Sequence, residues 1–198
     1  MMRVNLNQMV ETPVNDDELY ERYKNGDTSA YDELILKYKD SLTRYLNGIL
    51  HNTSDAEDMM IEAFSWIMMK KPWIREGCFK AYLFQVARRY AIRLKTRSHR
   101  KDEFSLEEME AEPASKESVE NTAILGDQKK ILWQCMDRLD PMEREALYLV
   151  YYDGMTYLQA AEVMKVTYKK VDHLLEKGKL KMREELKKGG VTDPFLLA

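Results

Sequence analysis

The sequence has few of the residues that interrupt helices and few of those that build metal sites. It contains 8 glycines and 5 prolines in 198 residues, and its apolar residues recur at helical spacing, so we expect almost no β-sheet. Its 2 cysteines, Cys78 and Cys135, form no CxxC pair, which fits reduced structural thiols in the cytosol. The 3 histidines are dispersed, so no metal site is indicated. These scarcities predict an all-α protein without a metal.

Other absences argue against membrane insertion and against catalysis. No apolar stretch approaches the roughly 18 residues of a membrane span, and the polar start MMRVNLNQ does not resemble a secretory signal. There is no glycine-rich phosphate loop and no pairing of a nucleophile with a base. We therefore expect a cytoplasmic protein that is not an enzyme, needs no cofactor and does not insert into a membrane.

What the sequence does contain is a local excess of positive charge at residues 70–101. The whole chain has a formal net charge of −3, yet this stretch holds eleven basic residues and one acid, Glu76. From Phe79 onward the apolar residues form one helical stripe, and Pro72 and Gly77 mark a break before the helix. One interpretation is a solvated basic helix. The other is a site for single-stranded nucleic acid, because cations follow phosphates and exposed aromatic rings stack on unpaired bases.

On the second interpretation, residues off the apolar stripe contact the strand. We expect Arg88 and Lys95 to be exposed and Phe84 to lie off the stripe, while Trp73 either stacks on a base or caps the core under its loop. The candidate nucleic-acid contacts are Trp73, Arg75, Lys80, Phe84, Arg88, Arg89, Arg93 and Lys95.

Three helices are expected before the basic one. The first is capped by Asn15 or Asp16, and the second spans about 29–50. Ser54 with Glu57 predicts a capping box that opens the third. One face of that third helix is acidic and borders an apolar residue away from the core, which is either a solvated face or a protein contact. We favour the contact, through Asp55, Asp58, Ile61 and Glu62.

Residues 102–127 have the opposite charge to the basic helix. They hold nine acids and one base, together with Pro113, which predicts a flexible acidic linker. The linker either folds back over the basic helix or avoids DNA. The chain is thus predicted to form two helical domains, residues 15–101 and 128–188.

The second domain has the pattern of a helix-turn-helix. A helix restarts at Asp140–Pro141, and Thr156 with Gln159 opens a short helix that leads through a tight connection into a basic helix from Tyr168. Residues 165–188 hold nine bases and four acids, which favours DNA binding over a plain helical hairpin. The residues expected to face DNA are Thr167, Tyr168, Lys169, Lys170, Asp172, His173, Glu176 and Lys177.

Taken together, the two halves resemble bacterial RNA polymerase sigma factors of the extracytoplasmic-function (ECF) group. Residues 54–58, SDAED, are similar to the DAED-type motif of sigma region two, and residues 79–89, FKAYLFQVARR, to the F…WL…IAR run that follows it. Residues 139–145, LDPMERE, and 154–161, GMTYLQAA, resemble two segments of sigma region four. The resemblance spans about 27–186 in the family's order.

The resemblance implies a function for each domain. Region two would dock the acidic face of its third helix on the clamp coiled coil of core RNA polymerase, and would melt and capture the minus-ten strand with residues 70–101. Region four would read the duplex minus-thirty-five element. Core polymerase and promoter DNA are the implied partners, and an anti-sigma factor is a further candidate.

Several residues depart from the family pattern. Ile61 replaces a usual glutamine, Arg89 an asparagine, and Asp172 and Glu176 add acids to the recognition helix. Two alternatives stay open: a helix-turn-helix regulator that does not engage core polymerase, and a protein–protein adaptor that has lost DNA binding.

Overall fold

The computed structural model describes residues 15–104, 132 and 134–188, and these residues contain helices and no strand. This confirms the predicted all-α class. Within the described residues, no helix is both long enough and apolar enough to cross a membrane. Residues 105–127 of the predicted linker lie outside the described residues. The helices are α1 (Asp16–Lys24), α2 (Thr28–Leu50), α3 (Thr53–Lys70), α4 (Phe79–Phe104), α6 (Pro141–Leu147), the π-helix η1 (Tyr148–Tyr152), α7 (Tyr157–Met164) and α8 (Tyr168–Lys188).

Most helices begin where a side chain caps their free N–H groups. Asn15 caps α1 as predicted, and Asp140 caps α6 with Pro141 at the first helical position. The predicted capping box of Thr156 and Gln159 at α7 is present in full.

The predicted start of α3 is wrong. Asn52, not Ser54, is the N-cap, because its extended backbone lets the side-chain oxygen accept a hydrogen bond from the N–H of Asp55 at 3.1 Å. The helix therefore begins at Thr53.

Helices α1 to α4 form the first unit, whose core is rich in tyrosines that also hydrogen-bond across it. Their rings are buried while each hydroxyl donates to a backbone carbonyl at the end of α3 or just after it. Tyr20 donates to Pro72 at 2.8 Å, Tyr23 to Met68 at 2.9 Å and Tyr31 to Phe64 at 2.5 Å. The last turns of α3 and the connection to α4 are thereby held against α1 and α2.

Helices α6, η1, α7 and α8 form the second unit, together with a short helical stretch at residues 134–137. Ala160 and Ala161 are buried where α7 meets its neighbours, and Lys165 ends α7 in the left-handed conformation. Half-buried Val166 then packs against the core at the corner before α8. This is the predicted helix-turn-helix.

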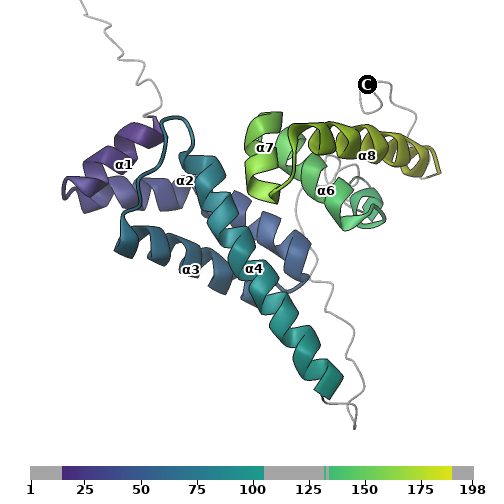
Figure 1. Cartoon of the computed structure of the whole chain (residues 1–198), viewed down its shortest axis with the longest axis horizontal. Helices are drawn as coiled ribbons and strands as arrows, with labels where there is room; N and C mark the ends of the chain where they lie inside the picture. The colour runs from purple at the N-terminus through teal and green to yellow at the C-terminus, as the bar shows by residue number, and fades with distance from the viewer. Residues whose placement is uncertain (1–14, 105–131, 133, 189–198) are drawn as a thin grey trace, which may run out of the picture.

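The two units pack against each other. Helix α4 contacts α7, and α2 contacts α6. Figure 1 shows α4 running between the two groups of helices, with its C-terminal half extending beyond them.

Candidate functional site

Trp73 lies on a well-anchored loop, and its side chain is free of the core. The backbone of this loop is fixed at both ends, since Tyr20 donates to the carbonyl of Pro72 and the N–H of Gly77 donates to the Asp17 carboxylate at 2.6 Å. Trp73 itself is 82 % exposed. The alternative that Trp73 caps the core is therefore wrong, and the ring is accessible to a base.

Phe84 is placed differently from its prediction. It is fully buried, and its ring centroid lies 5.2 Å from that of Tyr45 on α2. The expectation that Phe84 is available to stack on a base is wrong. Its burial follows from the packing of α4, which is covered by α2 and α3 on one side and by α7 on another.

Residues 70–101, the basic segment, carry cations that fall into two groups. Arg89, Arg93 and Lys95 are exposed, with the Arg89 guanidinium over the ring of Trp66 and the Lys95 ammonium donating to the carbonyl of Ile49.

Arg75, Lys80 and Arg88 form the second group, because each pairs with an acid of the second unit. Arg88 was expected to be exposed, but its side chain is only 15 % exposed, so that expectation is wrong.

Burial and charge set the protonation of this second group. Burial alone would lower the pKa of Arg88, but the hydrogen bonds and the charge of Glu145 outweigh it and leave that pKa raised. Burial also raises the pKa of Asp153, which Lys80 only partly counteracts. The pKa of Tyr45 lies well above its ordinary value, first because the ring is buried and then because Glu145 is adjacent.

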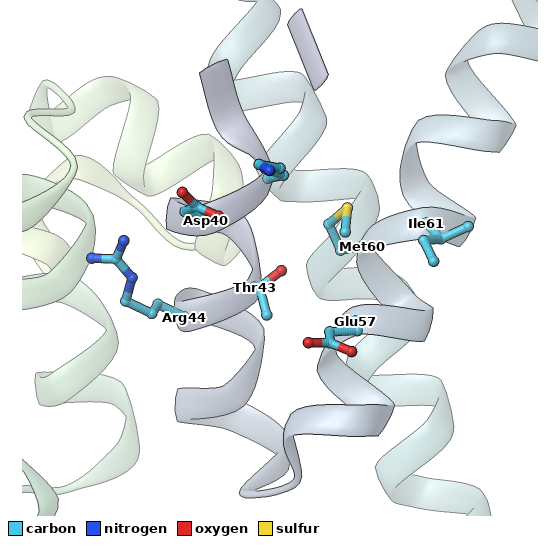
Figure 2. A pocket seen from close by; sticks show the side chains of 7 residues that line it. Asp40, Thr43, Arg44, Glu57, Met60 and Ile61 are labelled. Carbon is cyan, nitrogen blue, oxygen red and sulfur yellow. The ribbon is translucent and has the colours of Figure 1, made fainter. Parts of the chain in front are cut away.

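The acidic face of α3 is largely accessible. Asp58 and Glu62 are exposed, Asp55 is half-buried, and Ile61 between them is 56 % exposed. A groove runs beside this face between α3 and α2. Its α3 wall consists of Glu57, Met60 and Ile61, and Figure 2 shows Met60 pointing from α3 toward α2.

The sequence pattern did not predict the α2 wall of this groove. It consists of Lys39, Asp40, Thr43 and Arg44. A signal was present, because Asp40 and Arg44 lie one turn apart on a different face from the buried Leu42 and Leu46.

Helix α8, the second helix of the helix-turn-helix, exposes the face that was predicted to contact DNA. All eight residues expected to face DNA are exposed, including the acids Asp172 and Glu176. The Tyr168 ring lies 5.5 Å from that of Tyr157. The Thr167 hydroxyl accepts a hydrogen bond from the N–H of Lys170 at 3.2 Å, so it also caps α8. Contact of this face with DNA remains a prediction.

Neither a metal site nor a disulfide is found in the part of the chain that the structure describes. No group of histidines, cysteines and acids is arranged to hold a metal there. Cys78 is half-buried and Cys135 buried, both as free thiols.

The family model and the relatives that match this chain all describe sigma factors. Residues 129–182 match the family model described as Sigma-70, region 4. The chain is 28 % identical over 162 residues to RNA polymerase sigma-H factor of Pseudomonas aeruginosa, covering 77 % of this chain and 84 % of that protein. It is 26 % identical over 149 residues to ECF RNA polymerase sigma factor SigK of Mycobacterium sp. (strain KMS), covering 73 % and 75 %.

Two solved structures share the fold. The sigma factor RpoE from Bartonella quintana, crystallised with the anti-sigma factor NepR, aligns with a TM-score of 0.63 at 20 % identity, covering 79 % of this chain and 96 % of that one. CnrH, in complex with the cytosolic domain of CnrY, aligns with a TM-score of 0.61 at 18 % identity, covering 87 % and 97 %. At these identities the likeness establishes the fold.

Proposed function

The chain belongs to the extracytoplasmic-function group of sigma factors, and from this we propose that it binds core RNA polymerase and directs promoter recognition and melting in transcription initiation. The observation that carries the proposal is a sigma-70 region 4 match in the second unit together with relatives aligned over about three quarters of the chain. On this proposal the protein acts in the cytoplasm and performs no catalysis of its own.

We assign polymerase docking to the exposed face of α3. Asp58 and Glu62 surround an apolar side chain, Ile61, that the core does not use. An apolar residue bordered by charges suits a protein contact, in which the charges speed association and the buried residue prolongs the complex. The clamp coiled coil of the polymerase is the surface we propose for it.

The promoter contacts are divided between the units. Trp73, Arg89, Arg93 and Lys95 are exposed along the α3–α4 loop and α4, where we place capture of the melted strand. The open face of α8 is where we place reading of the duplex minus-thirty-five element. An anti-sigma factor is a further proposed partner, since the fold is shared with RpoE, which is bound to one.

The docking assignment is tested by the double charge reversal Asp58→Lys with Glu62→Lys. The matched control reverses two exposed acids elsewhere in the first unit, Glu18→Lys with Asp32→Lys. Affinity for purified core polymerase is measured by fluorescence anisotropy across a range of salt concentrations, with helicity checked by circular dichroism.

We expect the α3 double variant to bind core polymerase at least roughly tenfold more weakly, a loss of ~1.4 kcal/mol, while the control binds like the wild type. Equal affinity of the α3 variant and the wild type would remove α3 from the docking surface.

A further inference from the structure

Three tyrosines and a lysine form a connected row beside α8 in the second unit. The Tyr168 ring lies 5.5 Å from the Tyr157 ring, and the Lys179 ammonium lies 5.8 Å from the centre of the Tyr151 ring. Burial is the first cause that raises the pKa of Tyr157, and the Tyr151 hydroxyl and the Lys179 ammonium also act on that pKa. The four side chains are therefore neighbours, and we call them the tyrosine row.

The tyrosine row is accessible, although its rings are large and apolar. Tyr151 is 58 % exposed and Tyr168 is 49 % exposed, while Tyr157 and Lys179 are half-buried. Single apolar residues on a surface are common, but a group of exposed apolar side chains marks an interaction site. The row is therefore a candidate contact for a ligand or partner of the second unit.

The row joins the starts of both helices of the helix-turn-helix. Tyr157 is the first residue of α7 and Tyr168 is the first residue of α8, and Tyr151 lies in η1 just before α7. In this motif the second helix enters the major groove with its N-terminal residues, and the first helix crosses the sugar–phosphate backbone. A row between the two starts therefore lies at the edge of the groove, where the phosphates of one strand are expected.

Lys179 extends the row along one side of α8. It follows Tyr168 by eleven positions, which is about three helical turns, so both residues lie on the same side of the helix. Eleven positions correspond to about 16 Å of helix. One DNA strand carries a phosphate for each 3.4 Å of the duplex axis, roughly, so several phosphates can face a row of this length.

The chemistry of the row suits phosphate more than a base or an apolar protein groove. A phenol hydroxyl donates to phosphate oxygens and an ammonium pairs with their charge, and neither contact distinguishes one base pair from another. Asp172 is the acid of α8 that also acts on Tyr157. It follows Tyr168 by four positions, which rotates it about 40° around the helix from the row. We assign Asp172 to a cytosine amino group, because a carboxylate would repel phosphates.

We propose that the tyrosine row binds the phosphates of one DNA strand at the edge of the major groove, and so fixes the register of α8 on the duplex without reading its sequence. It rests on the proposed function, in which α8 reads the duplex minus-thirty-five element. Tyr151, Tyr157 and Lys179 act as positioning residues, and the base contacts are made by the exposed face of α8.

The test uses the full chain and removes hydroxyls and charge separately. Tyr151→Phe with Tyr157→Phe removes two hydroxyls and keeps both rings. Lys179→Ala removes the cation, and Lys179→Arg restores it. Affinity is measured by fluorescence anisotropy over a range of salt concentrations. The probes are a fluorescein-labelled duplex that the wild type selects from a random-sequence library, single-base-pair variants of that duplex, and an unselected duplex.

Two matched controls remove the same groups outside the row. Tyr152→Phe removes a hydroxyl from the same π-helix, at a ring that lies 5.5 Å from the Arg44 guanidinium of α2. Lys37→Ala removes an exposed cation of the first unit. Thermal melting followed by circular dichroism checks that every variant folds.

We expect the double tyrosine variant to bind every duplex at least roughly tenfold more weakly, because each lost hydroxyl donates to a charged group. The slope of log affinity against log salt concentration should not change in this variant, since no charge is lost. Lys179→Ala should also weaken binding to every duplex and should lower that slope by about one, and Lys179→Arg should restore both. The controls should stay within about twofold of the wild type. If the double variant does not fold, Tyr151→Phe alone should lose at least roughly threefold.

Three results would overturn the inference. Folded row variants that bind every duplex like the controls would exclude the row from DNA. A loss confined to one base pair would make the row a reader of bases. Unchanged duplex binding with weaker binding to core polymerase would make the row a protein contact.

Run-off transcription with core polymerase separates this failure from failure of the proposed function. If the wild type supports run-off while the row variants bind duplexes like the controls, only the assignment of the tyrosine row is wrong. If the wild type supports no run-off, the proposed function is wrong, and the salt dependence on the unselected duplex still decides whether the row binds phosphates.

Discussion

Trp73 and Phe84 are aromatic residues of the same basic segment. We predict that truncating them has opposite effects on the stability of the fold and on promoter opening. Trp73 is 82 % exposed, so Trp73→Ala removes almost no buried area, and the free energy of unfolding should change by less than about 0.5 kcal/mol. Phe84 is 0 % exposed and packs on Tyr45, so Phe84→Ala leaves a cavity and should cost about 3–5 kcal/mol. For a unit of the size of residues 15–104, each kcal/mol of lost stability lowers the melting temperature by about 4–8 °C.

The functional effects should run the other way. Loss of one base stacked on Trp73 should weaken promoter opening by about 1–3 kcal/mol, or roughly 5- to 150-fold in the opening equilibrium. The assay combines urea denaturation followed by circular dichroism with open-complex formation by core polymerase, read from a fluorescent base analogue in the minus-ten strand. Phe84→Ala should reduce opening only through its loss of folded protein. A large loss of stability in Trp73→Ala, with normal promoter opening by the folded variant, would show that Trp73 supports the loop and does not stack on a base.

Three further predictions concern charged residues. Arg93→Ala with Lys95→Ala should flatten the salt dependence of promoter-strand binding by about one to two units, and an unchanged slope would exclude both residues from the strand path. The melting temperature should change little, because both side chains are exposed and only the exposed hydrogen bond from Lys95 to the Ile49 carbonyl is lost. Asp172→Ala or Glu176→Ala should relax preference at one base pair by about 1–3 kcal/mol in duplex binding, and uniformly tighter binding on all sequences would instead show that these acids only repel phosphates. The hydrogen bond from Ser29 is the first cause that lowers the pKa of Asp27 from 3.8 to about 2. The stability that Asp27 contributes is therefore complete above its unfolded pKa and is lost as the pH falls toward 2. Urea unfolding from about pH 5 to about pH 2 should show this loss of stability in the wild type and a smaller loss in Asp27→Ala.

The sequence predicted the local structure well where caps and apolar periodicity agree. Helix α2 begins within one residue of its expected start, and α7 and α8 meet in the expected turn. At α3 two residue types competed for the cap, and the extended backbone of Asn52 decided against Ser54. Local signals of this kind depend on a few neighbouring residues, which is why they can be read from the chain.

The surfaces were harder to predict, because one helix can be covered on two sides. Periodicity identified the face of α4 that carries Leu83 and Ala87, but it gave no sign of the second unit on an adjoining face. That second contact pairs Arg88 with Glu145, 57 positions later in the chain, whereas Phe84 is buried against Tyr45 of α2. An isolated helical pattern does not specify which residue from so distant a segment lies against it.

The central claim is most directly tested by run-off transcription with purified core polymerase and a library of promoter sequences, with and without this protein. We expect transcripts that start at defined positions, require the protein and are lost in the Asp58→Lys, Glu62→Lys variant but not in the Glu18→Lys, Asp32→Lys control. Absence of any protein-dependent transcript, with duplex DNA still bound through α8, would contradict it and would make the chain a helix-turn-helix regulator that does not engage the polymerase.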